Sequence, residues 1–499
     1  MATSKKNFLE MTRKGRIPPL YKEIPYAPPR SMYEPFASRN SFLLESVKWP
    51  EKIARYSFIG FDPCLTFKTE DGVIETEPRW NSSAFKKRPL RALKAILSNY
   101  SQEPLAHLAP FQGGLVGILN YDFVHYLESL PRNATDDLGL PDSHFLMIDK
   151  LIAFDHIARK CWVIVCPGVR DTLAPGTTSR TADWSQKYDE AERDIATIED
   201  RISGAKAPSA RGKTEVISSH SSLAHIDIVY EMTKKDYMNI VKRAKEYIGA
   251  GDIFQANLSQ RLSAPVGAKS PWNLYRTLSD INPSPFAAFL DFGDYQIVSS
   301  SPERLLRIKE RIIETRPIAG TRPRGRDGRE DELMRRELLL NEKERAEHIM
   351  LIDLERNDLG RVSEYGTVRV DELMITEDYS HVIHIVSNVS GDLAKSKDCF
   401  DAIKATFPGG TITGVPKVRC MEIIDELEPV KRGPYTGSIG YIAFSGNMDL
   451  NIVIRSFVIS NGRVYVQAGA GIVADSDPEK EYFESLKKAE ALIRTLEKV

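Results

Sequence analysis

The sequence predicts an α+β protein with large antiparallel β-sheets that are flanked by helices. Strand-like runs often follow one another directly, as in residues 151–166, where two such runs flank a polar turn. Segments with helical spacing are fewer, and they do not alternate regularly with the strands. This order of elements argues against a doubly wound parallel sheet.

The chain divides into two predicted domains. Residues 15–166 form the first, and their strand-like runs include residues 55–63 and 113–123. Residues 167–225 differ in composition: stretches rich in Pro, Gly, Ser and Thr flank a short, charged amphipathic helix, which indicates a partly mobile linker. Residues 226–499 form the second domain.

The second domain opens with a helix that Thr233 caps and that Gly249 and Gly251 end. A strand follows, and then a hairpin with Gly293 and Asp294 at its turn. The remaining predicted elements are, in order, one long helix at residues 330–360, a pair of strands within 368–393, three or four strands within 433–475, and a terminal helix at 478–499.

The composition excludes several classes of protein. The 499 residues carry 68 basic and 69 acidic side chains, so the net charge of −1 argues against a strongly basic nucleic-acid binder. No run approaches the roughly 18 apolar residues of a membrane-spanning helix. The N-terminus lacks the apolar region of a secretory signal, and the five cysteines are an odd, scattered set. We therefore expect a cytoplasmic protein that binds neither nucleic acid nor membranes.

Two predicted helices carry glutamates three residues apart. Glu344 and Glu347 form one pair, and Glu481 and Glu484 form the other. Residues at this spacing lie on one face of a helix, so two such faces could place four carboxylates around a Mg²⁺ ion. Glutamates at this spacing are also common on solvated helix faces, and the spacing alone does not decide between the two interpretations.

Three segments combine glycine with charged or polar residues. Residues 316–325 predict an arginine-rich turn, residues 407–417 a glycine-rich loop before a helix, and residues 467–479 a glycine turn after a strand. Each could be simply a tight turn. Together with the acid pairs they predict a polar pocket for a small polyanion that is bound through Mg²⁺.

In this combination the chain resembles the chorismate-binding enzymes. The resemblance covers residues 232–499, and the most similar branches are anthranilate synthase component I and aminodeoxychorismate synthase component I. Residues 41–46 and 55–60 also resemble the amino-terminal domain of anthranilate synthase. The resemblance rests on the motifs RPIAGTRPRG, NEKERAEHIMLIDLERNDLGRV, YSHVIHIVS, FPGGTITGVPKVRCMEIIDELEP and VQAGAGIVADSDPEKEY.

The resemblance implies a role for each residue of the predicted site. His384 would be the catalytic histidine that helps to aromatise the intermediate, and Lys488 would help to neutralise the acids. Glu347 and Glu484 would bind Mg²⁺, with Glu344 and Glu481 beside them as ligands or to order water. The implied substrate-binding residues are Gly320, Thr321, Tyr435, Arg455, Gly469, Ala470 and Gly471, with Thr321 also among the catalytic set.

The implied reaction adds ammonia at C2 of chorismate and expels pyruvate to give anthranilate. Relatives that add water use a lysine base where this chain has Gln255, and a neutral amide cannot deprotonate water. The chain has no G-x-C-x-G glutaminase motif. The resemblance therefore implies a separate glutamine amidotransferase subunit, component II, as the source of ammonia.

The product stays open between two aminases. Many aminodeoxychorismate synthases carry a lysine where this chain has Ala319, and that lysine forms an adduct at C2. Alanine cannot form this adduct, so the position favours anthranilate as the product. Phe286 and Ala287 depart from the usual anthranilate synthase motif, and aminodeoxychorismate synthase component I, which leads to p-aminobenzoate and folate, remains the alternative. Ser46, Pro285, Phe286 and Ala287 would bind tryptophan as a feedback effector. A non-catalytic paralogue that binds a glutaminase partner is the remote alternative.

Overall fold

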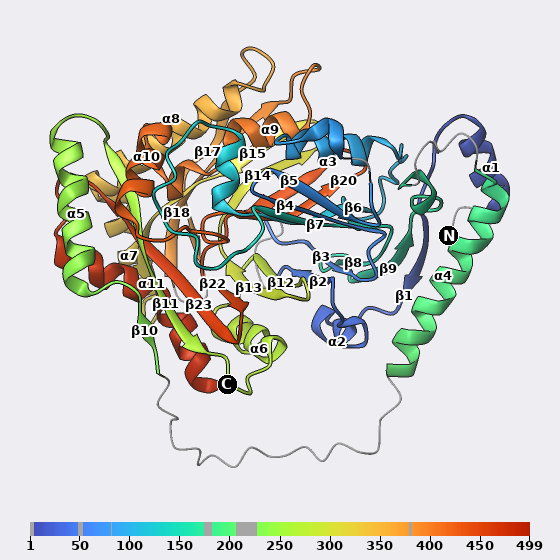
Figure 1. The fold of residues 1–499 in the computed structure, drawn as a ribbon, viewed down its shortest axis with the longest axis horizontal. Coiled ribbons are helices and arrows are strands. Elements are labelled where there is room, and N and C mark those ends of the chain that lie inside the picture. Colours follow the sequence, from blue (N-terminus) through green and yellow to red (C-terminus); the bar gives the residue numbers. More distant parts are fainter. Residues whose placement is uncertain (1–3, 48–52, 81, 174–181, 206–226, 379–381) are drawn as a thin grey trace.

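The computed structural model describes residues 4–47, 53–80, 82–173, 182–205, 227–378 and 382–499 (Figure 1). Much of the predicted linker, at 174–181 and 206–225, lies outside the described residues, and so does the prediction of its mobility. None of the helices in the described ranges is long and apolar enough to cross a membrane.

Two large sheets form the centre of the molecule, and every strand pair within them is antiparallel, as the sequence predicts. In the described residues the first sheet has 12 strands in the order β1 (Leu20–Ile24), β9 (Lys160–Val165), β8 (Lys150–Asp155), β3 (Tyr56–Gly60), β2 (Ser41–Glu45), β12 (Phe286–Asp291), β13 (Tyr295–Ser301), β22 (Ser456–Ser460), β23 (Arg463–Ile472), β11 (Gln255–Pro265) and β10 (Val229–Tyr230), with β19 (Gly414–Val415) paired to β11.

The second sheet has 11 strands within the described part of the chain. Their order is β16 (Ile318–Pro323), β18 (Val382–Asp392), β15 (Ile312–Arg316), β14 (Arg304–Lys309), β21 (Met448–Asn451), β20 (Ser438–Ala443), β6 (Gly114–Leu119), β7 (Ser143–Ile148), β4 (Leu65–Glu70) and β5 (Val73–Glu77), with β17 (Arg369–Asp378) paired to β18. Both sheets contain strands from the first and the second predicted domain, since β2 pairs with β12 and β6 pairs with β20. The two-domain division stays a prediction.

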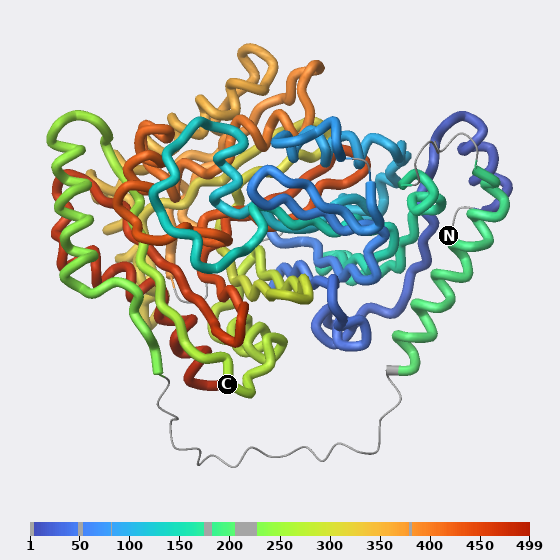
Figure 2. The backbone as a smooth tube through the Cα atoms, viewed as in Figure 1, coloured from blue at the N-terminus to red at the C-terminus, as the bar shows by residue number. Residues whose placement is uncertain are grey.

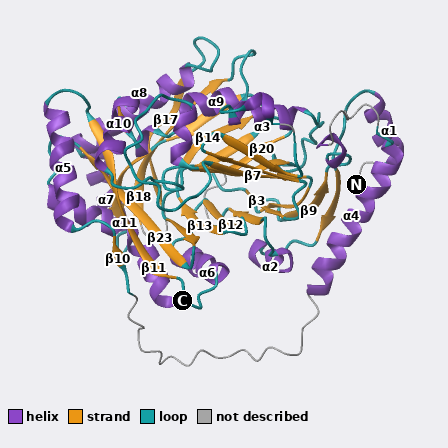
Figure 3. Cartoon of the chain, viewed as in Figure 1, coloured by secondary structure: helices purple, strands orange, loops and turns teal. Residues whose placement is uncertain are grey.

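Helices cover the outer faces of the two sheets (Figure 3). They are α1 (Lys5–Arg13), α2 (Pro29–Tyr33), α3 (Pro89–Ser98), α4 (Trp184–Ala205), α5 (Lys234–Gly249), α6 (Pro271–Ile281), α7 (Gly328–Leu340), α8 (Glu342–Gly360), α9 (Cys399–Thr406), α10 (Lys417–Leu427) and α11 (Pro478–Lys498). Short 3-10 turns are η1 (Glu34–Phe36), η2 (Ser83–Phe85), η3 (Tyr121–Tyr126), η4 (Arg170–Leu173) and η6 (Gly410–Ile412).

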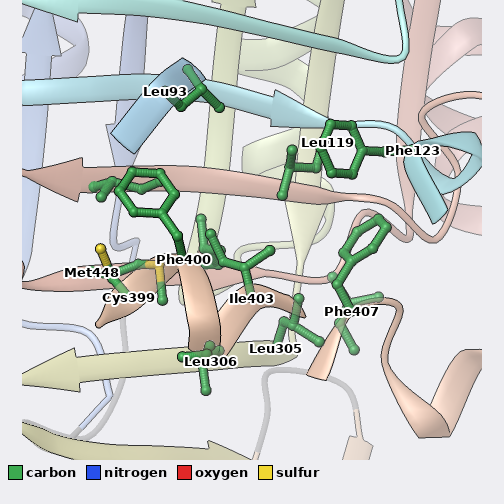
Figure 4. Close-up of a cluster of buried hydrophobic side chains, with 14 of the residues drawn as sticks. Leu93, Leu119, Phe123, Leu305, Leu306, Cys399, Phe400, Ile403, Phe407 and Met448 are labelled. Carbon is green, nitrogen blue, oxygen red and sulfur yellow. The ribbon is translucent and has the colours of Figure 1, made fainter. Parts of the chain in front are cut away.

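Apolar side chains join these layers. One buried cluster lies between the sheets, with Phe58 of the first sheet against Phe111 and Tyr441. A second cluster packs α1, α4, α6 and α11 on the outer face of the first sheet. The third packs α3 and α9 on the second sheet, with Phe400 and Ile403 of α9 near Leu306 and Met448 (Figure 4). Fully burying such a side chain contributes about 1.5–3 kcal/mol, so these contacts fix the strands that carry the site.

Most predicted elements are confirmed, and one helix prediction is wrong. Thr233 caps α5 by accepting a hydrogen bond from the backbone N–H of Asp236, and β12 and β13 form the predicted hairpin. The single helix predicted at residues 330–360 is two helices, α7 and α8, that meet at Asn341. The Asn341 side chain accepts a hydrogen bond from the backbone N–H of Glu344, which satisfies a free donor of the new helix.

Candidate functional site

The centre of the site is the pairing of β16 with β18. Thr321 lies opposite His384 in the register, and Nδ1 of His384 is 2.9 Å from the Thr321 hydroxyl and 3.1 Å from the carbonyl oxygen of Gly320. The segment that carries Gly320 and Thr321 was predicted as a turn, and that prediction is wrong. It is a strand with a bulge between Ala319 and Thr321, because Gly320 has a φ of +66° that strand geometry does not allow.

His384 is a neutral base in this position. Burial lowers the pKa of its ring to about 4, and the nearby positive charge of Arg455 adds to the effect. The carbonyl oxygen of Gly320 can only accept, so the hydrogen bond to it assigns the ring proton to Nδ1. Nε2 is then the nitrogen with the lone pair, and it can take a proton from a substrate.

Gly320 also makes room for Glu344. A Cβ atom at Gly320 would lie 2.5 Å from Oε2 of Glu344, which is closer than any real contact. Arg322 donates to Oε1 of the same carboxylate at 2.7 Å. Oε2 is buried and has no hydrogen-bond partner among the described residues. Glu344 thus offers one acceptor atom to a cation or a donor group of a ligand, next to the Gly320–Thr321 strand.

The second acid pair lies on α11, which the Asp477 side chain caps. Glu484 is exposed, and its carboxylate is 3.0 Å from Nζ of Lys488 one turn later. The same ammonium donates to the carbonyl oxygen of Gly469 at 3.0 Å. Lys488 therefore joins the acidic helix to the glycine-containing strand β23.

The two acid pairs lie close enough to repel each other. Burial raises the pKa of Glu347, and the charges of Glu344, Glu484 and Glu481 raise it further. The pKa of Glu481 is also raised by burial and by Glu484. Within the described ranges, no three such side chains stand close enough to hold a metal ion as they lie. A hard divalent cation would relieve this repulsion and draw the carboxylates together, so the donor set fits Mg²⁺.

Two glycines of β23 face the neighbouring strand β11. A Cβ at Gly469 would lie 2.4 Å from the carbonyl oxygen of Leu258, and one at Gly471 would lie 2.5 Å from Nε2 of Gln255. The predicted glycine turn is therefore wrong, because both glycines lie inside a strand where close approach excludes a side chain. Ala470 between them is fully buried in the core, so only its backbone can face a ligand.

Glu303 is a candidate catalytic residue that the sequence analysis missed. It lies between β13 and β14 and is 6% exposed, and burial raises its pKa to about 7. The charges of Arg455 and Lys488 and the backbone N–H of Ile318 oppose this rise, which places the carboxyl beside the predicted site. In the sequence, the signal for Glu303 is a single acidic residue between two strand-like runs. A charge there is costly once the strands are buried, unless it is paired.

Tyr435 and Arg455 are the remaining residues of the predicted substrate pocket. Tyr435 is buried, and its ring centroid is 5.6 Å from the guanidinium of Arg432. Arg455 has a φ of +52°, and its carbonyl oxygen accepts from the backbone N–H of Ser300 at 3.2 Å. Its charge lowers the pKa of both His384 and Glu303, so a single arginine stands near the neutral base and the buried acid.

The predicted effector residues line one cavity of about 270 Å³ between the two sheets. Ser46 donates from its hydroxyl to the carbonyl oxygen of Pro285 at 3.1 Å, which joins β2 to the segment before β12. Phe286 lies under the guanidinium of Arg304 at 5.1 Å. The wall of the cavity includes all four predicted effector residues, Ser46, Pro285, Phe286 and Ala287. The rest of the wall comes from residues of both sheets.

A comparison with known families places the chain in one of them. The family described as chorismate binding enzyme matches residues 39–494 of this chain. The chain belongs to the chorismate binding enzymes. The matched residues include most of the first predicted domain, whereas the five motifs of the sequence analysis lie within residues 232–499.

Individual members of the family show how near the two branches are. Anthranilate synthase component 1 of Acetivibrio thermocellus is 44% identical over 471 residues, which cover 94% of this chain and 92% of that protein. Aminodeoxychorismate synthase component 1 of Bacillus subtilis is 44% identical over 460 residues, which cover 92% of each chain. The chain is thus a chorismate-utilising enzyme of the group that includes these two synthases.

Solved structures confirm the fold. The crystal structure of anthranilate synthase component I from Streptococcus pneumoniae has a TM-score of 0.74 and 36% identity, and the match covers 88% of this chain and 92% of that one. MenF, the menaquinone-specific isochorismate synthase from Escherichia coli, has a TM-score of 0.65 at 18% identity, over 98% of this chain and 99% of its own. At that identity the likeness shows the fold alone.

Proposed function

We propose that the chain is the chorismate-binding subunit of an anthranilate synthase, which adds ammonia at C2 of chorismate and eliminates pyruvate with Mg²⁺ as cofactor. The observation that carries the proposal is Ala319, which precedes Gly320 in β16 and pairs with Ile385, the neighbour of His384. A methyl side chain cannot attack the ring, so C2 stays open to ammonia.

The acid pairs of α8 and α11 support Mg²⁺ as the cofactor. Glu347, Glu481 and Glu484 would hold the ion, and Glu344 would stand beside them with its unpartnered Oε2. Bound there, Mg²⁺ would supply positive charge to a carboxylate of chorismate and to the leaving oxygen at C4.

The side chains of the site account for the proton transfers. Glu303 keeps its proton up to about pH 7 and can give it to the C4 hydroxyl, which leaves as water while ammonia bonds to C2 and loses a proton. The neutral ring of His384 then accepts the C2 proton as the C3–oxygen bond breaks, and the released enolpyruvate takes up a proton. Chorismate and ammonia thus give anthranilate, pyruvate and water.

The ammonia comes from a separate glutaminase subunit in this proposal. The chain has no G-x-C-x-G motif, and its five cysteines, all of them in the described residues, are buried. A buried thiol with a raised pKa, such as that of Cys166, is a poor nucleophile. The relatives from A. thermocellus and B. subtilis are each named component 1, which supports a second component here.

The cavity beside Ser46 is the proposed effector site for tryptophan. Its volume of about 270 Å³ and its aromatic wall suit a small aromatic amino acid, and Arg55 and Arg307 bring positive charge to it. The cavity lies between β2 and β20, so a ligand there touches both sheets.

Aminodeoxychorismate synthase component I remains the second candidate, because the B. subtilis protein of that name is as similar as the A. thermocellus anthranilate synthase. One experiment separates the two candidates. The purified chain is incubated with chorismate, Mg²⁺ and excess ammonium near neutral pH, where Glu303 still holds part of its proton, and the products are identified. Anthranilate with an equal amount of pyruvate supports the proposal. Aminodeoxychorismate without anthranilate would support the second candidate, and no turnover would contradict both.

A further inference from the structure

Arg432 is a buried arginine whose hydrogen-bonding capacity is fully used. It is 2% exposed, and it lies in the segment between α10 and β20. Nε and one terminal nitrogen donate to the two carboxylate oxygens of Glu428 at 2.9 and 2.7 Å. The other donors reach the carbonyl oxygens of Ile412 and Asn257 and the hydroxyl of Thr436, at 3.0, 2.6 and 3.3 Å. All five N–H groups of the guanidinium therefore have an acceptor.

Glu428 extends this network to the strand of the site glycines. Its Oε1 also accepts from the backbone N–H of Ser259 at 2.8 Å and from the Ser259 hydroxyl at 2.9 Å. Ser259 of β11 lies opposite Gly469 of β23 in the register. The carboxylate receives four hydrogen bonds, so the desolvation of both charges is compensated and the geometry of the pair is fixed.

Two aromatic rings hold the guanidinium from outside this network. The ring centroid of Tyr435 is 5.6 Å from it, and that of Tyr121 in η3 is 4.8 Å from it. The backbone N–H of Tyr121 donates to the carbonyl oxygen of Gly433 at 2.7 Å, and the Tyr121 hydroxyl has no hydrogen-bond partner among the described residues. Tyr121 therefore contacts Arg432 through its ring, and its backbone holds Gly433, the next residue.

Tyr121 begins a segment of the first predicted domain that lies across the second. After η3 the chain continues over the C-terminal part, where Asn133 donates its backbone N–H to Asp425 at 2.8 Å (Figure 2). Lys431 pairs with Asp136 of this segment at 2.9 Å, directly before Arg432. The segment thus holds the loop of Arg432 and Tyr435 in place from outside the site.

We infer that Arg432 is a positioning residue for chorismate, held by Tyr121, and that it sets the place of three parts of the site at once. These parts are Tyr435, the glycine-rich loop through Ile412, and β23 through Glu428 and Ser259. The inference rests on the proposed function and deepens it, because it makes a residue of the first predicted domain necessary for binding the substrate.

The test separates positioning from general destabilisation by comparing two matched variants. Tyr121→Leu removes the ring beside Arg432 and leaves its five hydrogen bonds. Phe145→Leu removes a ring that is 1% exposed in β7, in the same apolar cluster as Tyr121. Both variants lower the melting temperature by a similar amount because each loses one buried ring.

Of these two variants, only Tyr121→Leu is expected to weaken chorismate binding. Binding is measured by calorimetry and as KM for pyruvate release. The expected rise is about tenfold, since about 1.4 kcal/mol of lost positioning energy corresponds to that factor. Arg432→Lys, with three donors in place of five, is expected to weaken binding at least as much. Equal chorismate affinity in Tyr121→Leu and Phe145→Leu would overturn the inference while wild-type turnover still supports the proposed function. A wild-type chain that does not bind chorismate would overturn both.

Discussion

Replacing Glu303 by glutamine is expected to stabilise the fold and to remove activity. The carboxyl is 6% exposed, and its pKa rises from 4.5 to about 7 because it is buried. A tenfold change in proton affinity corresponds to about 1.4 kcal/mol, so ionised Glu303 costs the native state about 3 kcal/mol. Glutamine has nearly the same shape and carries no charge, and it avoids this cost.

The stability gain depends on pH in a direction that follows from the raised pKa. Below about pH 4.5 the carboxyl is protonated in both the folded and the unfolded chain, and the variant gains nothing. Between about pH 4.5 and 7 only the unfolded chain ionises fully, so the wild type loses stability as the pH rises. Above about pH 7 the difference is constant, and the variant is more stable by about 3 kcal/mol.

Urea unfolding at pH 5 and pH 8 measures this difference, and pyruvate release from chorismate measures activity. Loss of a general acid lowers the rate by roughly 10²- to 10⁴-fold. Glu497→Gln is the control, since that carboxylate is exposed on the last turn of α11 and its removal changes neither property. The reasoning is refuted if Glu303→Gln is less stable than the wild type at pH 8, or if it keeps full activity.

Three further predictions concern the metal, the strand bulge and the effector. Glu484→Gln is expected to abolish Mg²⁺-dependent pyruvate release while the free energy of unfolding changes by about 0.5 kcal/mol or less, because the side chain is exposed; retained Mg²⁺-dependent turnover counts against the metal assignment. Gly320→Ala is expected to lower the free energy of unfolding by about 1–3 kcal/mol, because its Cβ meets the Glu344 carboxylate at a φ of +66°; urea unfolding that matches the wild type would show that the bulge relaxes freely. Tryptophan is expected to bind the wild type in calorimetry but not Ser46→Phe, which fills the cavity of about 270 Å³; equal binding to both would place the effector elsewhere.

Local signals in the sequence predicted the elements well where one residue type determines the geometry. The cap at Thr233 and the turn at Gly293 needed no knowledge of the tertiary structure, because a side-chain oxygen or a free φ angle is a local property. Asn341 carried such a signal too, and continuous helical spacing on both sides concealed the break. The helix spacing of apolar residues does not record where one helix ends and the next begins.

The site was harder to predict, because its residues meet through pairings that are distant in the chain. The spacing of Glu344 and Glu347 shows that they share a face, but not that α11 lies near that face. The glycines of β23 look like turn residues until Gln255 and Leu258 of β11 are placed against them. Motif resemblance supplied these residues. The sequence marks Glu303 only as a single acid between two strand-like runs, and its burial, which makes it a candidate, is known only from the structure.

Locating the divalent ion with a substrate analogue bound tests the central claim most directly. Crystals grown with Mn²⁺ in place of Mg²⁺ and a non-reactive chorismate analogue allow the ion to be found by its anomalous scattering. The account predicts one ion between α8 and α11 in direct contact with Glu347 and Glu484, with an analogue carboxylate beside Gly320 and Thr321. An analogue bound at Thr321 with no ion near these glutamates would contradict it.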